Sequence, residues 1–283
     1  MRFERATIIG LGLIGGSLAK ALRRRGLARE IVGAGRNLAL LDLARREGVI
    51  DRSETDPITA VRMADLVILA TPVGVLGTLL EALWHHVNGE ALFTDVGSVK
   101  GPLVRHADRL AASRPLGFVG GHPMAGSEQS GYSVSRADLF EGTLTILTPG
   151  AASAPDTVKR ARALWEGIGS RVVECSPEEH DRIVAAVSHL PHLVAYALVA
   201  AVAFPDETLL GYVADGFKDT TRIAASPGAL WREVFELNRA PLLEMVHRYR
   251  EELDRLEGYI KTNDWETLEQ ALEAIRRQRE QLQ

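Results

Sequence analysis

The chain has 283 residues, of which 46% are hydrophobic and 25% charged, and it carries a formal net charge of −4 with an isoelectric point near 6.1. This composition provides a core without a disulfide or a metal, in one large or two ordinary domains. The acidic balance argues against a nucleic acid or an anionic membrane as a partner. The chain has one cysteine, Cys175, and its N-terminus enters a predicted strand at once, so we expect a cytoplasmic protein without a signal peptide.

Strand and helix patterns alternate through the first 176 residues. An apolar run over 5–10 ends in glycine, a helical pattern follows over 11–26, and a second apolar run lies at 30–36. Further short apolar runs lie at 66–73, 90–98, 115–122, 144–149 and 170–175. Runs without polar alternation are typical of parallel strands covered on both faces. We therefore predict an α/β fold with a Rossmann-type, doubly wound parallel sheet over residues 1–176.

Residues 177–283 show helical patterns and no strand pattern. The longest apolar stretch, 190–205, is too short to span a bilayer and predicts a buried helix. Farther along, apolar side chains three or four residues apart form two seams: Leu242, Val246, Tyr249, Leu253, Leu256 and Ile260, then Trp265, Leu268, Leu272 and Ile275. Helices of this kind pack on other helices, within a monomeric bundle or across a dimer. We expect a C-terminal all-α domain that binds substrate and forms a homodimer.

A glycine pattern opens the first predicted helix. Gly10, Gly12 and Gly15 spell G-x-G-x-x-G directly after a strand, which is the context that dinucleotide binding requires. The glycines permit a tight turn, close approach of a pyrophosphate and close packing of helix on strand. The phosphates then meet the first N–H groups of the helix, at Leu13 and Ile14.

Two further positions bear on the cofactor. Thr71 and Pro72 follow another strand and are expected to line the cofactor cleft. Arg36 stands where an acidic residue would hold the ribose hydroxyl of NAD. A guanidinium suits a phosphate, so Arg36 favours NADP; the alternative is that Arg36 is a solvated surface residue and NAD is still accepted.

The stretch "GGHPMAG" mounts His122 between glycines at the end of a predicted strand. In open α/β sheets, ligands bind beyond the carboxyl ends of the strands, and a neutral imidazole is a suitable base near pH 7. Ser98, in "DVGSVKG", follows the preceding strand. It either reaches the nicotinamide site or caps the next helix, and both roles could coexist.

The segments "IIGLGLIGGSLAKAL", "DVGSVKG", "GGHPMAGSEQSGY", "SHLPHLVAYAL" and "GFKDTTRIAASPGALW" resemble the prephenate and arogenate dehydrogenases of tyrosine biosynthesis. The resemblance runs in order over nearly the whole chain. It implies an oxidoreductase that converts prephenate to 4-hydroxyphenylpyruvate, or arogenate to tyrosine, by hydride transfer to NAD(P) with loss of carbon dioxide. It also implies a Rossmann domain followed by a helical dimerisation domain.

The same resemblance implies roles for residues. His122 would take the proton of the substrate's C4 hydroxyl, and Ser98 would hydrogen-bond His122 or the C4 oxygen. Arg222 would bind a carboxylate through its planar fork, and Lys218, one helical turn earlier, could face the same cleft. The remaining substrate contacts would be His192, His189, Ser127 and Trp231, where His192 or Trp231 could instead serve only in packing.

The other histidines, His85, His86, His106, His180 and His247, receive no role. No further Cys or His cluster completes a metal site around His189 and His192, so none is predicted. Two other functions stay open: another dehydrogenase with a Rossmann and a helical domain, and a dimeric dinucleotide sensor without catalysis. No residue of the sequence decides between prephenate and arogenate.

Overall fold

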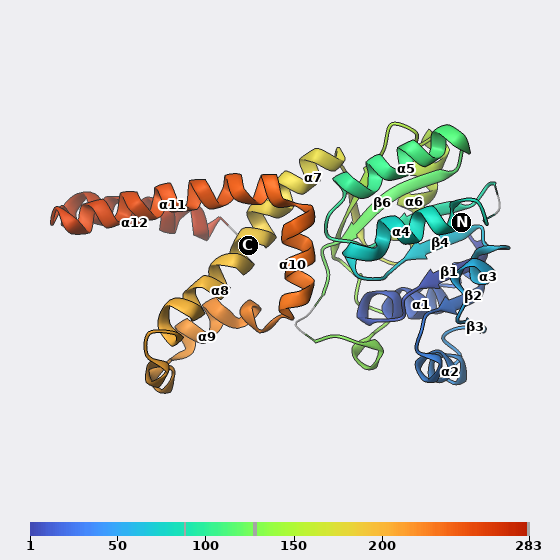
Figure 1. Cartoon of the computed structure of the whole chain (residues 1–283), viewed down its shortest axis with the longest axis horizontal. Helices are drawn as coiled ribbons and strands as arrows, with labels where there is room; N and C mark the ends of the chain where they lie inside the picture. Colours follow the sequence, from blue (N-terminus) through green and yellow to red (C-terminus); the bar gives the residue numbers. More distant parts are fainter. Residues whose placement is uncertain (88, 127–128, 282–283) are drawn as a thin grey trace. The chain divides into compact units, whose positions relative to one another are not determined.

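Eight strands form one sheet in the order β3-β2-β1-β4-β5-β6-β7-β8 in the computed structural model, which describes residues 1–87, 89–126 and 129–281. The strands are β1 (Phe3–Ile9), β2 (Ala28–Ala34), β3 (Arg52–Glu54), β4 (Leu66–Leu69), β5 (Leu92–Asp95), β6 (Gly117–Pro123), β7 (Leu144–Pro149) and β8 (Arg171–Glu174). The order places β1 centrally, with the chain running outward in both directions, so the predicted doubly wound α/β fold is confirmed (Figure 1).

Two details differ from the predicted sheet. β7 runs antiparallel to β6, whereas an entirely parallel sheet was expected. The described part of the connection between them holds only a three-residue helical turn, Tyr132–Val134, and therefore has no crossover helix to carry the chain back for a parallel return. The three-residue β3 was not predicted, because its residues are not fully buried and form no apolar run.

Helices cover both faces of the sheet and explain its apolar strands. The first six are α1 (Leu13–Arg25), α2 (Leu38–Arg46), α3 (Pro57–Val61), α4 (Val73–Trp84), α5 (Gly101–Ser113) and α6 (Pro155–Gly167). One core cluster joins α1 and α6 to the sheet through Leu18 and Trp165, and the other joins α4 and α5 through Trp84 and Leu103. Every residue of β4 is buried between these layers.

No strand follows Glu174 in the described residues, as predicted, and helices take over. They are α7 (Pro177–Val184), α8 (Leu190–Ala203), α9 (Asp215–Thr221), α10 (Gly228–Leu237), α11 (Arg239–Lys261) and α12 (Trp265–Glu280). By its internal contacts the chain forms two compact units, Met1–Asn238 and Arg239–Gln283. The domain boundary predicted after residue 176 marks the change from strands to helices and stays a prediction.

The expectation for the longest apolar stretch was wrong in two respects. A π-helical turn, Ala185–His189, joins α7 to α8, so the helix runs without a break over Pro177–Ala203. Its 27 residues, with a mean hydropathy of 1.8 in the most apolar 18-residue window, make it long and apolar enough to cross a membrane by length and composition. It is also not a buried helix, because only 22% of its most apolar window is buried within the chain.

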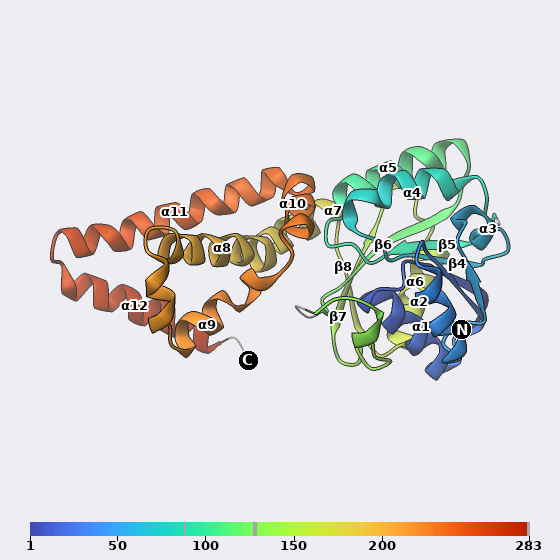
Figure 2. The same ribbon diagram turned by 60° about the horizontal axis from the view of Figure 1, so that its bottom comes forward.

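The second unit consists of α11 and α12, joined by a short turn (Figure 2). Asn263 adopts a left-handed φ of 53° in that turn, and Asp264 caps α12 by accepting from the Thr267 N–H. The predicted apolar seams lie on these helices, yet many of their side chains remain exposed in the single chain: Tyr249, Leu253, Ile260, Trp265, Leu272 and Ile275. Contact between the two helices alone does not cover the seams.

Candidate functional site

The predicted site residues of the sheet lie at one edge. β1, β4, β5 and β6 are neighbours and parallel, so their carboxyl ends point the same way. The glycine turn follows β1, Thr71 and Pro72 follow β4, Ser98 follows β5, and His122 lies near the end of β6. This is the edge at which open α/β sheets bind their ligands.

The glycine turn packs tightly on β4 except at one position. A Cβ on Gly10, whose φ is +98°, would lie 2.6 Å from the Ala70 carbonyl oxygen, and one on Gly15 would lie 1.9 Å from the Gly10 oxygen. A Cβ on Gly12 would meet nothing within 4 Å. The helix α1 starts here at Leu13 without a side-chain cap. The backbone is therefore approachable at Gly12, where the first N–H groups of the helix have no side-chain cap among the described residues, as a bound pyrophosphate requires.

Two further observations fit a dinucleotide. The Thr71 hydroxyl is buried and has no hydrogen-bond partner among the described residues, so a ligand group could satisfy it. Arg36 is exposed just beyond the carboxyl end of β2. The adjacent Asn37 accepts from the Leu40 N–H and caps α2.

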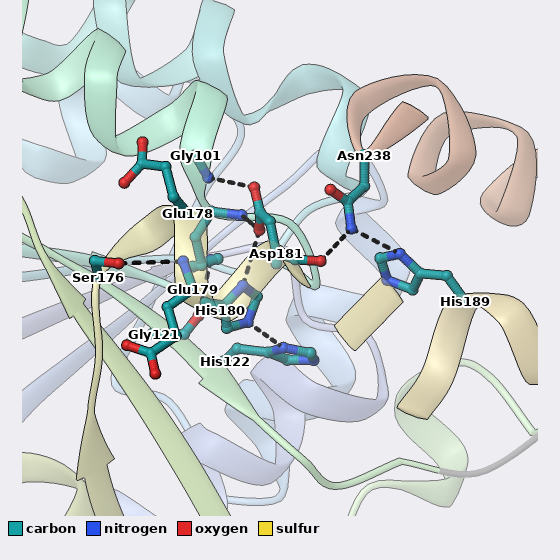
Figure 3. A network of polar contacts seen from close by, with 12 residues as sticks. Gly101, Gly121, His122, Ser176, Glu178, Glu179, His180, Asp181, His189 and Asn238 are labelled. Atoms are coloured by element: carbon teal, nitrogen blue, oxygen red, sulfur yellow. Dashed lines mark hydrogen bonds and ion pairs between the residues drawn. The ribbon is translucent and has the colours of Figure 1, made fainter. Parts of the chain in front are cut away.

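His122 belongs to a buried chain of side chains that starts at the N-terminus of α5. The residue is 9% exposed, and its Nδ1 lies 2.8 Å from Nε2 of His180, which is completely buried (Figure 3). The other ring nitrogen of His180, Nδ1, lies 2.8 Å from Oδ1 of Asp181. The two imidazole rings meet edge to face, with centroids 5.1 Å apart.

Asp181 caps α5 from a distant part of the chain. Its Oδ1 accepts from the Lys100 N–H and its Oδ2 from the Gly101 N–H, both at 2.8 Å. A carboxylate at a helix N-terminus is stabilised by these N–H groups and by the helix dipole. Burial raises the pKa of Asp181, but hydrogen bonds from His180 and the two N–H groups outweigh it, so the pKa lies below its ordinary value.

Lys100 lies fully buried beneath the same edge. Its ammonium pairs with Asp95 and donates to the Gly121 carbonyl at 2.9 Å. Asp95 also accepts from the N–H groups of Gly97, at 2.8 Å, and Gly121, at 3.2 Å. The carboxylate and ammonium thus have the multiple partners that a buried charge pair requires, and they tie β5, β6 and the start of α5 together.

The environment of His122 keeps it neutral. Burial lowers its pKa well below 6.5, and the nearby His180, Lys100 and His189 lower it further. An imidazole with so low a pKa carries no charge at pH 7 and can accept a proton there.

A second arm of the network reaches His189, which is also completely buried. The Asn238 amide nitrogen donates to the main-chain oxygen of Asp181 at 2.8 Å, which fixes the amide's orientation, and the same nitrogen lies 3.0 Å from Nδ1 of His189 (Figure 3). Nδ1 must therefore accept, so the proton of neutral His189 is on Nε2. Burial lowers the pKa of His189 to about 4. Its Nε2–H is buried without a partner in the described structure.

Trp231 connects His189 to His192. The Trp231 ring stacks on His192, with centroids 3.6 Å apart and planes at 25°, and meets His189 edge to face. His192 Nδ1 donates to the Ser188 carbonyl at 2.9 Å. Trp231 Nε1–H is a second buried donor for which the described residues supply no acceptor. Two such donors close together suit an oxygen-rich ligand.

The remaining predicted residues are placed less tightly. Burial lowers the pKa of His192, and the positive charge of Arg222 lowers it further, so the exposed Arg222 lies near this histidine. Lys218 is exposed and pairs with Asp215 at 4.0 Å. Ser98 is partly buried; it neither caps α5, because Asp181 does, nor hydrogen-bonds His122. Ser127 lies outside the described residues.

Five residues of this network carried no predicted role: Asp95, Lys100, His180, Asp181 and Asn238. His180 and Asp181 are adjacent in the sequence, but they lie 58 and 81 residues from the partners they contact in β6 and α5. No periodicity or spacing reports a contact of that separation. The one available signal was a histidine next to an aspartate at the start of an amphipathic helix, and it is weak.

Comparisons with known proteins match most of the chain. The family model described as prephenate dehydrogenase, nucleotide-binding domain, matches residues 18–174, and that described as prephenate dehydrogenase, dimerization domain, matches residues 176–274. Prephenate dehydrogenase of Bacillus subtilis (strain 168) is 38% identical over 265 residues, which are 92% of this chain and 71% of the relative.

Two solved structures are also similar over their full length. Prephenate dehydrogenase from A. aeolicus, in complex with hydroxyphenyl propionate and NAD+, has a TM-score of 0.93 and 35% identity, covering 100% of this chain and 99% of that one. Arogenate dehydrogenase from Synechocystis has a TM-score of 0.85 and 31% identity, covering 98% and 99%.

Substitutions in the glycine turn separate ligand binding from folding. Gly12→Ala adds a methyl group into open space, so the free energy of unfolding should change by less than about 0.5 kcal/mol. If a pyrophosphate occupies that space, the Kd for NAD(P) rises by roughly tenfold or more. Gly15→Ala is the control, because its methyl group meets the Gly10 carbonyl and should destabilise the fold by roughly 1–3 kcal/mol. Calorimetric titration and urea unfolding measure both quantities, and unchanged cofactor binding by Gly12→Ala would contradict this placement.

Proposed function

The chain belongs to the prephenate dehydrogenase family, and from that premise we propose that it oxidises and decarboxylates prephenate, arogenate or both with NAD(P). One observation carries the proposal: a buried, neutral imidazole, His122, lies at the sheet edge that also bears the glycine turn. Such an enzyme needs a base at neutral pH beside a dinucleotide, and this edge offers both.

The chemistry assigns one proton transfer to the protein. When bound at the glycine turn, NAD(P) would supply a nicotinamide that can take hydride from C4 of the cyclohexadienol ring. His122 accepts the proton of the C4 hydroxyl, so C4 becomes a carbonyl carbon. The resulting dienone is a vinylogous β-keto acid, which loses its ring carboxylate as carbon dioxide and becomes aromatic. Aromatisation makes the reaction irreversible.

The second set of residues suits the anionic groups of the substrate. The Nε2–H of His189 and the Nε1–H of Trp231 are buried donors that a carboxylate or keto oxygen could satisfy. Arg222, near His192, is proposed to bind a carboxylate, since a guanidinium pairs with it bidentately. Lys218, Ser98 and Ser127 are proposed as further polar contacts.

NADP is the proposed preferred cofactor. Arg36 lies at the carboxyl end of β2, where an NAD-specific site would have an acidic side chain, and a guanidinium attracts the additional phosphate of NADP. The solved relative from A. aeolicus holds NAD+, so members of the family need not share this preference.

Steady-state kinetics with prephenate and arogenate, each with NAD and NADP, test the function and the cofactor preference together. We expect at least one substrate to yield reduced cofactor and carbon dioxide in equal amounts, with a higher kcat/KM for NADP than for NAD. A higher value for NAD would contradict the role of Arg36. If the folded protein turns over none of the four combinations of substrate and cofactor, the function is contradicted and a dinucleotide sensor is favoured.

His122→Asn is the matched variant for this assay. It retains a polar side chain but removes the base, so kcat should fall by roughly 10²–10⁴-fold while KM for the cofactor stays the same. Wild-type turnover by this variant would exclude His122 as the base.

A homodimer is proposed as the working form. The region matched by the dimerization-domain model contains the apolar side chains that the single chain leaves exposed, among them Leu253 at 53% and Trp265 at 56%. Contiguous exposed apolar side chains mark association surfaces. Light scattering coupled to size-exclusion chromatography should give twice the mass of the 30.8 kDa chain. A single-chain mass at micromolar concentration would contradict it.

A further inference from the structure

The proposed function assigns no task to His180 and Asp181, although His180 bonds directly to the proposed base. His180 is completely buried and Asp181 is 6% exposed. The capping of α5 explains why a carboxylate is buried at position 181, because the Lys100 and Gly101 N–H groups need an acceptor. It does not explain why an imidazole, with two polar atoms to satisfy, lies between that carboxylate and His122.

The hydrogen bonds determine which nitrogen of each ring carries the proton. An ionised carboxylate only accepts, so Nδ1 of His180 is the donor toward Asp181. Burial lowers the pKa of His180, so the ring is neutral and its Nε2 has a lone pair. This Nε2 can only accept from Nδ1 of His122. Neutral His122 therefore carries its proton on Nδ1, and its Nε2 is unprotonated.

We propose that His180 and Asp181 are positioning residues that hold His122 in the tautomer whose Nε2 can accept a proton from substrate. The proposal rests on the proposed function. In the opposite tautomer, Nε2 would carry a hydrogen and could not act as a base. The alternating donors and acceptors from the α5 N-terminus to His122 select the competent form before substrate arrives.

The same series of hydrogen bonds also stabilises His122 once it is protonated. When His122 accepts a proton on Nε2, its Nδ1–H still donates to His180, which in turn donates to a carboxylate. The groups that face His122 otherwise oppose its protonation, because Lys100 is positive and because a proton on His180 or His189 would repel one on His122. The carboxylate of Asp181 raises the pKa of His180, the residue to which His122 donates, against the lowering by burial. A hydrogen-bonded imidazolium is thereby stabilised in an otherwise unfavourable site.

Two substitutions at one position separate positioning from packing. His180→Met fills the space but offers His122 no strong acceptor. His180→Gln restores both contacts, since its amide oxygen can accept from His122 while its amide nitrogen donates to Asp181. His106→Met, on α5, is the control, because His106 has no part in the network.

The tautomer is read by NMR on protein labelled with ¹⁵N-histidine, where protonated and unprotonated ring nitrogens differ in chemical shift. We expect His122, assigned by the loss of its signals in His122→Asn, to be protonated on Nδ1 in the wild type and in His180→Gln. In His180→Met this preference is lost. In parallel, kcat falls by roughly 10²-fold or more in His180→Met, recovers in His180→Gln to within about tenfold of wild type, and is unchanged in His106→Met. The KM for the cofactor stays constant throughout.

The outcomes distinguish this proposal from the function it rests on. If His180→Met keeps the Nδ1-protonated form of His122 and wild-type kcat, positioning by His180 is excluded. If His180→Gln is as impaired as His180→Met, the residue acts through shape alone and the proposal is also overturned. If the wild type shows the expected tautomer but turns over neither substrate, the proposed function fails while the positioning stands. Should His180→Met not fold, the tautomer and kcat of His180→Gln still decide.

Discussion

The carboxylate of Asp181 at the N-terminus of α5 is the interaction on which the site depends. One residue accepts two helix N–H groups and one imidazole through its side chain, and the Asn238 amide through its main-chain oxygen. These bonds lead to His122 on one side and to His189 on the other (Figure 3). The positions of both histidines therefore follow from the docking of α7 against the carboxyl edge of the sheet.

The two arms leave the histidines in complementary states. His189 has its proton on Nε2 because its Nδ1 accepts from Asn238, so it presents a buried donor. The hydrogen bonds through His180 give His122 the opposite tautomer, with the proton on Nδ1, as proposed. Both rings are neutral because they are buried. A substrate with a hydroxyl to deprotonate and anionic oxygens to bind matches such a pair. Beneath them, Lys100 and Asp95 hold β5 and β6 in register at the cost of burying two charges.

Features that depend on residues close together in the sequence could be predicted. The apolar strands, the glycine turn and the change from strands to helices after residue 176 each rest on neighbouring residues, and the structure has them. The antiparallel β7, the short β3 and the π-helical turn before α8 depend on tertiary context. The same holds for the exposure of α8, whose apolar residues a single chain does not bury. Ser98 was a plausible cap for α5, yet Asp181 from a distant helix takes that place. The sequence indicated no role for His180 for the same reason, since its partner His122 lies 58 residues away.

The folded protein keeps His122 neutral and ready to accept a proton. The pH dependence of kcat/KM for the wild type, with the better substrate and cofactor, tests it most directly. The neutral imidazole is the active form, and its pKa is lowered well below 6.5, so kcat/KM should be at its plateau at pH 6.5. It should fall only as the pH drops further, through that lowered pKa. A half-maximal kcat/KM at pH 6.5 or above, with His122 titrating there, would contradict the account.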